Sequence, residues 1–183
     1  MHCPTKQHLG AAKRILRYVA GSVQFGIWYK SVKNFKLKGY TDSDWAGCVD
    51  DRKSTSGSVF DLGSGAITWS SKKQDTVALS SSEAEYVAAG AAAKQALWLK
   101  KLLKDLCCEQ QEALEVWCDN KSTIAMTMNP AFHARTKHIE VQYHFIRKLV
   151  SEGKIALKFC GTDFQNADLF TKALNHVKHN LGA

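Results

Sequence analysis

Residues 80–106, SSSEAEYVAAGAAAKQALWLKKLLKDL, carry seven alanines between positions 84 and 96. The helical periodicity and the serines at the start predict one long helix over this stretch. Because alanine side chains are small, such a helix can lie close against a β-sheet. The chain is therefore expected to fold around a sheet that this helix covers.

Segments with the character of strands lie on both sides of the predicted helix. Residues 56–73 contain two short strands around Gly63-Ser64-Gly65, which is typical of a hairpin. Further strands are predicted at residues 25–30, 35–42, 114–120 and 155–160, and further helices at residues 8–21, 122–129, 138–153 and 166–174. Antiparallel strands followed by α/β crossovers predict an α/β fold in which helices flank a mixed sheet.

The positive charge of the chain is concentrated at its N-terminal end. Residues 1–41 hold eight Lys/Arg and no Asp or Glu, whereas residues 42–183 hold seventeen of each sign. Such asymmetry favours a polyanionic partner, because phosphates release counterions when Lys and Arg replace them. A solvated basic face without a partner is the alternative. We expect a basic segment at residues 1–35, a domain at 36–176 and a short tail at 177–183.

Composition excludes several other classes of protein. No run approaches the roughly 20 apolar residues of a membrane-spanning helix, so no membrane partner is expected. The first residues show no apolar signal-peptide core. The six cysteines contain no CxxC pair, which indicates reduced cytosolic thiols and neither a disulfide framework nor a zinc site.

Four acidic residues stand at strand ends or helix starts: Asp42, Glu85, Asp119 and Asp168. In α/β sheets such positions can converge on one edge, where the carboxylates would repel one another. Mg²⁺ prefers oxygen ligands, and two such ions about 4 Å apart can activate a water and stabilise the leaving oxygen of a phosphodiester. Each residue also has a structural interpretation, since an Asp after a strand is often a turn former or a helix cap.

Glu83 and Glu85 compete for one role. Both fit the S-x-x-E spacing of a capping box with the preceding serines. Side chains two residues apart on a helix diverge by about 200°, so at most one of them faces a shared site. Spacing alone leaves this choice open.

Several strings along the chain closely resemble the ribonuclease H domain of copia-type retrotransposon Pol polyproteins. The resemblance is colinear over about residues 39–174 and is carried by YTDSDWAG, RKSTSGSVF, TWSSKKQ, VALSSSEAEYVA, CDNKSTIAM, NPAFHARTKHIEVQYHFIR and ADLFTKAL. The preceding HLGAAKRILRYVAG and GIWYK resemble the tail of the reverse transcriptase of the same polyprotein. The resemblance implies a ribonuclease H-like fold: a five-stranded mixed sheet whose first three strands are antiparallel, flanked by helices and preceded by a basic helical segment.

The resemblance also implies an activity and its residues. Asp42, Glu85, Asp119 and Asp168 match the acids that hold two Mg²⁺ ions, for which Mn²⁺ can substitute, and Glu83 becomes the cap. The implied reaction is hydrolysis of the RNA strand of RNA–DNA hybrids during reverse transcription, in cytoplasmic particles with the nucleus as a further location. An inactive nucleic-acid-binding or structural remnant is the alternative. Cys160-Gly161 replaces a Val-Pro pair of the family, so Asp168 is the acid whose position is least fixed.

Residues outside the acids are candidates for contact with the hybrid. Hydroxyl and basic side chains can position a duplex without reading its sequence, and an A-form-like hybrid is recognised by shape and phosphates. The candidates are Ser54, Thr55, Ser56, Asn120, Arg135, Lys137 and His138. The hydroxyl residues could equally satisfy a turn, and His138 could simply begin a helix. Trp45, beside Asp44, is the tryptophan of interest for base stacking, although core packing is the default for tryptophan.

Overall fold

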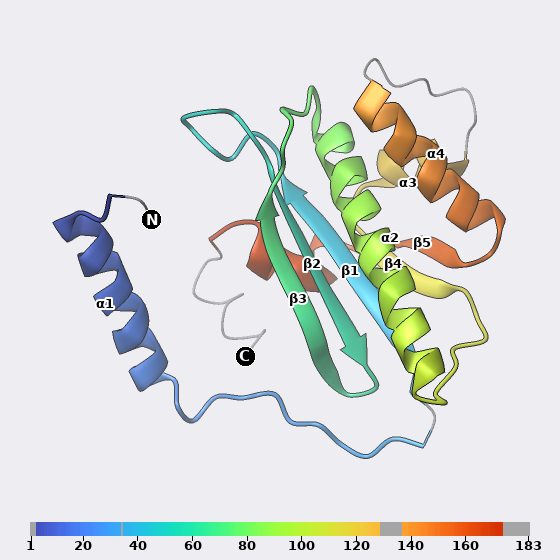
Figure 1. Ribbon diagram of the computed structural model, residues 1–183, viewed down its shortest axis with the longest axis horizontal. Coiled ribbons are helices and arrows are strands. Elements are labelled where there is room, and N and C mark those ends of the chain that lie inside the picture. Colours follow the sequence, from blue (N-terminus) through green and yellow to red (C-terminus); the bar gives the residue numbers. More distant parts are fainter. Residues whose placement is uncertain (1–2, 34, 129–136, 174–183) are drawn as a thin grey trace.

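Five strands form one mixed sheet in the order β3-β2-β1-β4-β5 (Figure 1). The computed structural model describes residues 3–33, 35–128 and 137–173, and for residues 137–143 the backbone alone. The strands are β1 (Leu37–Asp44), β2 (Thr55–Leu62), β3 (Gly65–Lys73), β4 (Leu114–Cys118) and β5 (Ile155–Phe159). β1, β2 and β3 pair antiparallel, whereas β4 pairs parallel with both β1 and β5. The predicted mixed sheet with three antiparallel strands first is confirmed.

The alanine-rich helix α2 (Ser81–Asp105) packs on one face of this sheet. Its buried side includes Ala84, Ala88, Ala92 and Ala96, all at most 1% exposed, so the helix backbone can approach β1 and β2 closely. Larger side chains such as Phe60, Val116 and Ile146 complete the core. This packing stabilises the fold, because burial of apolar area contributes roughly 25 cal/mol per Å².

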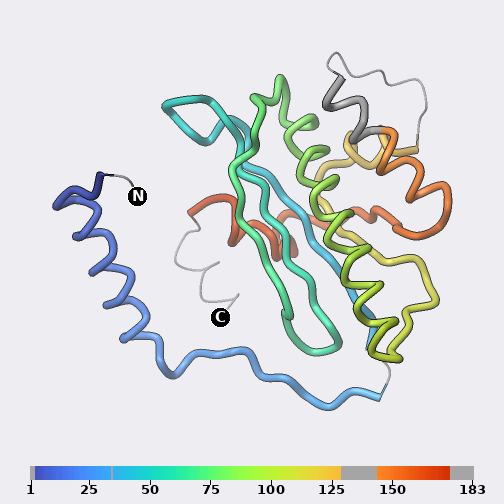
Figure 2. Tube along the Cα trace, in the orientation of Figure 1, coloured from blue at the N-terminus to red at the C-terminus, as the bar shows by residue number. Residues whose placement is uncertain are grey.

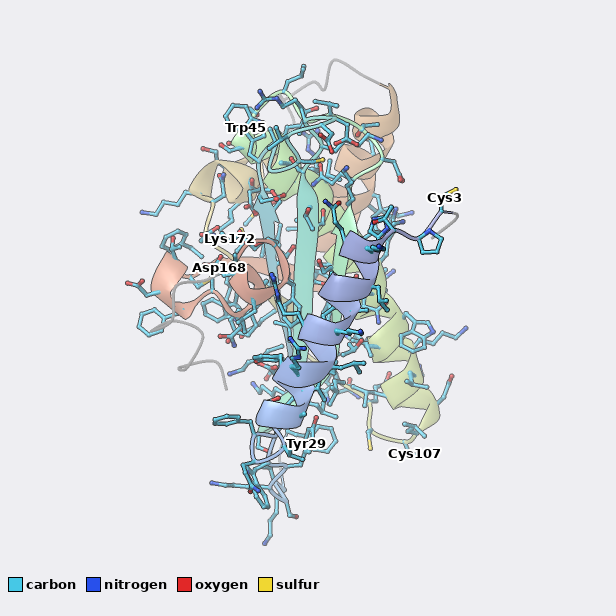
Figure 3. The ribbon with its side chains drawn as sticks, turned by 90° about the vertical axis from the view of Figure 1, so that its left-hand side faces the viewer. Cys3, Tyr29, Trp45, Cys107, Asp168 and Lys172 are labelled. Atoms are coloured by element: carbon cyan, nitrogen blue, oxygen red, sulfur yellow. The ribbon has the colours of Figure 1, made fainter. Side chains whose placement is uncertain are left out.

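Shorter helices follow the later strands. Helix α3 (Lys121–Met128) comes directly after β4, and α4 (Lys137–Ser151) packs against α2 and α3. Two 3-10 turns, η1 (Thr162–Phe164) and η2 (Asn166–Phe170), come after β5, and η2 contacts β1 and β2. In Figures 1 and 3 the η segments lie on the side of the sheet away from α2.

The helix predicted over residues 166–174 is confirmed only as a short 3-10 helix over Asn166–Phe170. The backbone N–H groups of Asp168 and Thr171 donate to carbonyls three residues earlier, at 3.3 Å each. Gln165 caps η2 by accepting from the N–H of Ala167 at 3.2 Å. Ala167 and Asp168 are buried, and η2 contacts β1 and β2.

Helix α1 (Lys6–Gly21) differs from the others because it has no buried residue. Figure 2 follows the chain from α1 through an extended connection to the start of β1. The strand predicted at residues 25–30 is wrong: this segment forms no sheet pairing. It is attached by isolated bonds instead, in which the N–H of Lys30 donates to Ser64 Oγ at 2.8 Å and the Tyr29 hydroxyl donates to the Ala66 carbonyl.

None of the helices in the described ranges has the length and apolar character needed to cross a membrane.

Candidate active site

Three carboxylates meet at the end of the sheet where β1 and β4 finish. One oxygen each from Asp42, Glu85 and Asp119 lies within 4.8 Å of the other two. β1 and β4 are parallel neighbours, so their carboxyl ends lie at the same edge, and the start of α2 reaches the same place. Asp42 stands two residues before the end of β1 and not at its end, because the strand continues to Asp44. We refer to these three residues as the acidic triad.

Hydrogen bonds at the start of α2 show why Glu85, and not Glu83, belongs to the acidic triad. Ser80 is the N-cap and its Oγ accepts from the N–H of Glu83 at 3.2 Å. The Glu83 carboxylate turns back and accepts from the N–H of Leu79 at 2.6 Å. Glu83 therefore closes the helix start, an arrangement typically worth about 1 kcal/mol. Glu85 is left to point into the site, as the resemblance implies.

The triad has too few donors for its oxygens. Glu85 Oε1 accepts from the N–H of Ser43 at 3.0 Å, and Asp119 Oδ2 accepts from the Thr162 hydroxyl at 3.1 Å. Glu85 Oε2 is buried and has no hydrogen-bond partner among the described residues. Buried acceptors are normally satisfied, and a hard divalent cation with oxygen ligands would satisfy this one. The donor set thus fits a Mg²⁺-type ion.

Burial and mutual repulsion make the triad resist full ionisation without a cation. Burial raises the pKa of Glu85 to about 9, with further contributions from the charges of Asp42 and Asp119. Burial also raises the pKa of Asp42, although the hydrogen bond from Thr171 and the ammonium of Lys172 oppose the change. A bound divalent cation would favour the charged forms and reverse these directions.

Asp168 reaches the site from the other face of the sheet, next to Asp42. It is 1% exposed, and its charge contributes to the raised pKa of Asp42. The ammonium of Lys172 lies 2.9 Å from Asp168 Oδ1 and 3.8 Å from Asp42 Oδ2. Figure 3 labels Asp168 and Lys172, which lie together beside the sheet. The hydroxyl of Thr171 donates to Asp42 Oδ2.

Sequence reasoning missed Thr171 and Lys172. The available signal was their place in ADLFTKAL, three and four residues after Asp168. A lysine four residues after an acid reads as an ordinary surface ion pair. Its closeness to Asp42 depends on how the turn docks on the sheet, which spacing does not reveal. For Lys172 itself, burial lowers the pKa, but the hydrogen bond to Asp168 and the charge of Asp42 raise it overall.

A glycine and a glutamine hold η2 against the sheet. Gly57 pairs with Asp42 across β1 and β2, and a Cβ at Gly57 would lie 2.6 Å from Thr171 Cγ2 and 2.9 Å from the Ala167 carbonyl oxygen. Only glycine lets the turn come this close. Gln165 is buried and its Nε2 donates to the Thr41 carbonyl at 2.9 Å. These contacts fix Asp168 without the Val-Pro pair of the family.

The predicted hybrid-binding residues fall into three groups. Ser54 is buried and its Oγ accepts from the N–H of Ala46 at 3.0 Å, which places it inside the loop and off the surface. The second group already takes part in hydrogen bonds within the protein. Ser56 Oγ accepts from Gln74 Nε2, Asn120 Oδ1 accepts from the N–H of Thr123 in α3, and the N–H of Thr55 donates to Asp44.

The third group consists of residues whose side chains the structure does not describe. Arg135 lies outside the described residues. Lys137 and His138 begin α4 by their backbone, and their side chains lie outside the described part.

Trp45 follows the last residue of β1 and is labelled in Figure 3. Its side chain is 54% exposed, and its indole N–H donates to the Ala78 carbonyl at 3.2 Å. The hydrogen bond anchors one edge of the ring and leaves much of it open to solvent. Trp45 is therefore not a core residue, which was the default for tryptophan.

Solved structures with the same architecture define the class of domain. The N-terminal RNase H domain of a Mycobacterium tuberculosis protein matches with a TM-score of 0.54 at 15% identity, covering 82% of this chain and 100% of that chain. LC11-RNase H1 in complex with an RNA/DNA hybrid matches with a TM-score of 0.52 at 16% identity, covering 74% of this chain and 94% of that chain. This chain therefore has a ribonuclease H-like fold.

Sequence relatives identify the family. The chain is 43% identical over 178 residues to the retrovirus-related Pol polyprotein from transposon TNT 1-94 of Nicotiana tabacum, covering 97% of this chain and 13% of the relative. It is 43% identical over 177 residues to that from transposon RE1 of Arabidopsis thaliana, covering 97% of this chain and 12% of the relative. Over nearly its whole length the chain is homologous to a part of the retrovirus-related Pol polyproteins of transposons, as its motifs indicated, and it spans 12–13% of their length. No protein-family model matches the sequence.

Proposed function

We propose that this domain hydrolyses the RNA strand of RNA–DNA hybrids, with two divalent metal ions held by the acidic triad and Asp168. The observation that carries the proposal is the meeting of three carboxylate oxygens within 4.8 Å, one residue of the three retaining a buried, unsatisfied oxygen. Mg²⁺ suits such a ligand set, and Mn²⁺ is a chemically similar substitute. The ribonuclease H-like fold and the Pol family of the chain support the same reaction.

The roles of the protein residues follow from their positions. Asp42 is central, since it belongs to the triad and also neighbours Asp168. The acidic triad and Asp168 would hold the ions, whose chemistry would be activation of a water and charge stabilisation at the phosphate. The N–H of Ser43 and the hydroxyl of Thr162 hold Glu85 and Asp119 in place. Because hydrogen bonds and burial fix these carboxylates, little reorganisation is needed when the substrate arrives.

The proposed substrate is a duplex bound by its backbone and shape. Contacts to phosphates position a duplex without reading its sequence, and an A-form-like hybrid is recognised by shape and phosphates. The exposed ring of Trp45 would offer a surface for packing on a sugar or a base. The basic N-terminal region would attract the phosphates of the hybrid, and this attraction does not depend on the nucleotide sequence. We therefore expect hybrid binding that weakens steeply with salt.

The N-terminal region is proposed to contact the reverse transcriptase portion of the same polyprotein. Its exposed apolar side chains include Leu9, Ile15, Leu16 and Val19 of α1, and Trp28 is 85% exposed. Exposed apolar side chains of this kind suit contact with another protein domain. A preceding polymerase domain would cover these residues and bring the triad near its product.

Incubation with a labelled RNA–DNA hybrid, with and without Mg²⁺, tests the proposed function. The matched protein is Asp119→Asn, which removes one charge of the triad from an incompletely buried position. Magnesium-dependent cutting of the RNA strand alone, lost in the variant, supports the proposal. Salt-sensitive binding without cutting by either protein would instead support an inactive binding module.

A further inference from the structure

The two ends of the proposed metal site differ in their counter-charge. Within the described residues, no basic side chain pairs with Glu85 or Asp119, whereas the Lys172 ammonium contacts both Asp168 and Asp42. Asp168 and Asp42 are both buried. Burying two carboxylates side by side is unfavourable unless a positive charge compensates them. Lys172 provides that charge when no metal is bound.

We propose that Lys172 is a resident counter-ion that occupies the cation position between Asp42 and Asp168, and that a divalent ion binds there only after the ammonium withdraws. The inference rests on the proposed function, because it concerns the second of the two ions. It makes the two positions unequal: the acidic triad accepts an ion directly, and the position beside Asp168 accepts one in competition with Lys172.

Competition follows from the size of the two cations. The ammonium nitrogen is 2.9 Å from Asp168 Oδ1, and Mg²⁺ binds carboxylate oxygens at about 2.1 Å. Asp42 and Asp168 would hold the ion through the oxygens that now face the ammonium, Asp42 Oδ2 and Asp168 Oδ1. The positive charges of the lysine and the ion would repel each other at this separation, so the two cations compete for the position.

The backbone of Lys172 is fixed by a hydrogen bond, whereas its ammonium group can move into solvent. Its N–H donates to the Asp168 carbonyl at 3.3 Å, which places its stem over the carboxylate. The side chain is 45% exposed, and lysine has a flexible four-carbon stem with a strongly hydrated charge. Withdrawal of the ammonium into solvent therefore requires no movement of η2.

Metal titration of the full chain tests the inference without any measurement of cleavage. Mn²⁺ binding is followed by calorimetry for the wild type, Lys172→Gln, Lys172→Arg and the control Lys148→Gln. Lys148 forms an exposed pair with Glu152 at the same four-residue spacing, 3.9 Å apart. We expect a stronger and a weaker class of site in the wild type. Removal of the competing charge in Lys172→Gln should tighten the weaker class about three- to tenfold.

The other variants give matched expectations. Lys172→Arg keeps the positive charge, and Lys148→Gln changes a distant ion pair. Both variants should therefore bind Mn²⁺ at the weaker site with the dissociation constant of the wild type. If the dissociation constant of Mn²⁺ at the weaker site is unchanged in Lys172→Gln while the stronger site is intact, this inference is overturned and the proposed function is not. Absence of Mn²⁺ binding altogether would overturn the proposed function as well.

Amine labelling of the wild type provides a test that needs no variant. If the second ion displaces the ammonium, saturation with Mn²⁺ should increase the reactivity of Lys172 toward an acylating reagent about severalfold. Lys148 serves as the internal reference in the same mass spectra. Equal reactivity of Lys172 with and without saturating Mn²⁺ would contradict displacement.

Discussion

The acidic corner (Asp42, Glu85, Asp119 and Asp168) and the N-terminal segment (residues 3–33) differ in the kind of side chain that they bury or expose. Asp42 and Asp168, which are charged groups, are almost completely buried. The apolar side chains of α1 and the connection after it are exposed. The corner carries an electrostatic cost that a bound cation would offset, whereas α1 buries no residue in the fold. The difference is what the proposals above require: metal binding at the corner and contact with another domain at the N-terminal segment.

Replacement of the central aspartate should have the largest effect. Asp42→Asn removes a charge shared by both proposed ion positions, so Mg²⁺-dependent cleavage should fall on the order of a thousandfold. Binding of the hybrid without cleavage should remain largely intact, because it depends on phosphate and shape contacts. Asp105→Asn, an exposed acid at the end of α2, serves as the control. Parallel loss of binding and cleavage in Asp42→Asn would count against a metal role.

Without metal, ionisation of Glu85 in the acidic corner should lower the free energy of unfolding as the pH rises. Since the folded-state pKa of Glu85 is raised to about 9, the folded protein binds a proton that the unfolded chain releases near its ordinary pKa. Metal-free stability should therefore be greatest at low pH within this window and fall as pH rises from about 4.5 to about 9. Denaturant unfolding at several pH values measures this slope.

A Glu85→Gln variant sharpens this prediction. The amide cannot ionise, so the variant should be more stable than the wild type by on the order of 2 kcal/mol near neutral pH in the absence of metal. Added Mg²⁺ should stabilise the wild type and narrow the difference. A wild-type slope identical to that of the variant would show that Glu85 ionises freely in the folded state.

An added methyl group between η2 and the sheet should weaken the packing that holds Asp168 beside Asp42. Gly57→Ala places a Cβ against Thr171 and the Ala167 carbonyl, so we expect destabilisation of about 1–3 kcal/mol and a larger loss of cleavage than of hybrid binding. Gly10→Ala is the matched control, because a Cβ there meets nothing within 4 Å and alanine favours the helix. Thermal unfolding and cleavage rates measure the two effects.

Removal of residues 1–33 should have the smallest effect on stability. Helix α1 buries no residue, so the free energy of unfolding should change by less than about 1 kcal/mol. Hybrid binding at low salt should weaken, because the basic segment is lost. A large drop in the unfolding midpoint would show that the segment belongs to the core after all.

Much of the fold could be predicted from periodicity and turn residues. The hairpin around Gly63 and the alanine-rich α2 were predicted correctly because each pattern reports its own local geometry. The segment at residues 25–30 has the same alternating character as a strand, yet a strand needs a neighbour with free backbone groups, and local sequence cannot supply that information. The tight turns of η2 likewise depend on packing against β1 and β2.

The site was predictable in part for the same reason. Asp42, Glu85 and Asp119 stand on regular elements whose ends converge, so their meeting follows from topology. The choice between Glu83 and Glu85 needed the resemblance, because both fit one spacing, and the structure then assigned the cap to Glu83. Thr171 and Lys172 are defined by tertiary docking across the sheet, which no spacing records.

The acids of the corner are drawn from four separate stretches of the chain, from β1 to the turn after β5. During synthesis the ribosome releases these stretches one after another, and the triad cannot close until β4 has inserted beside β1. The proposed centre is therefore complete only after the whole stretch from β1 to η2 has been synthesised and has folded.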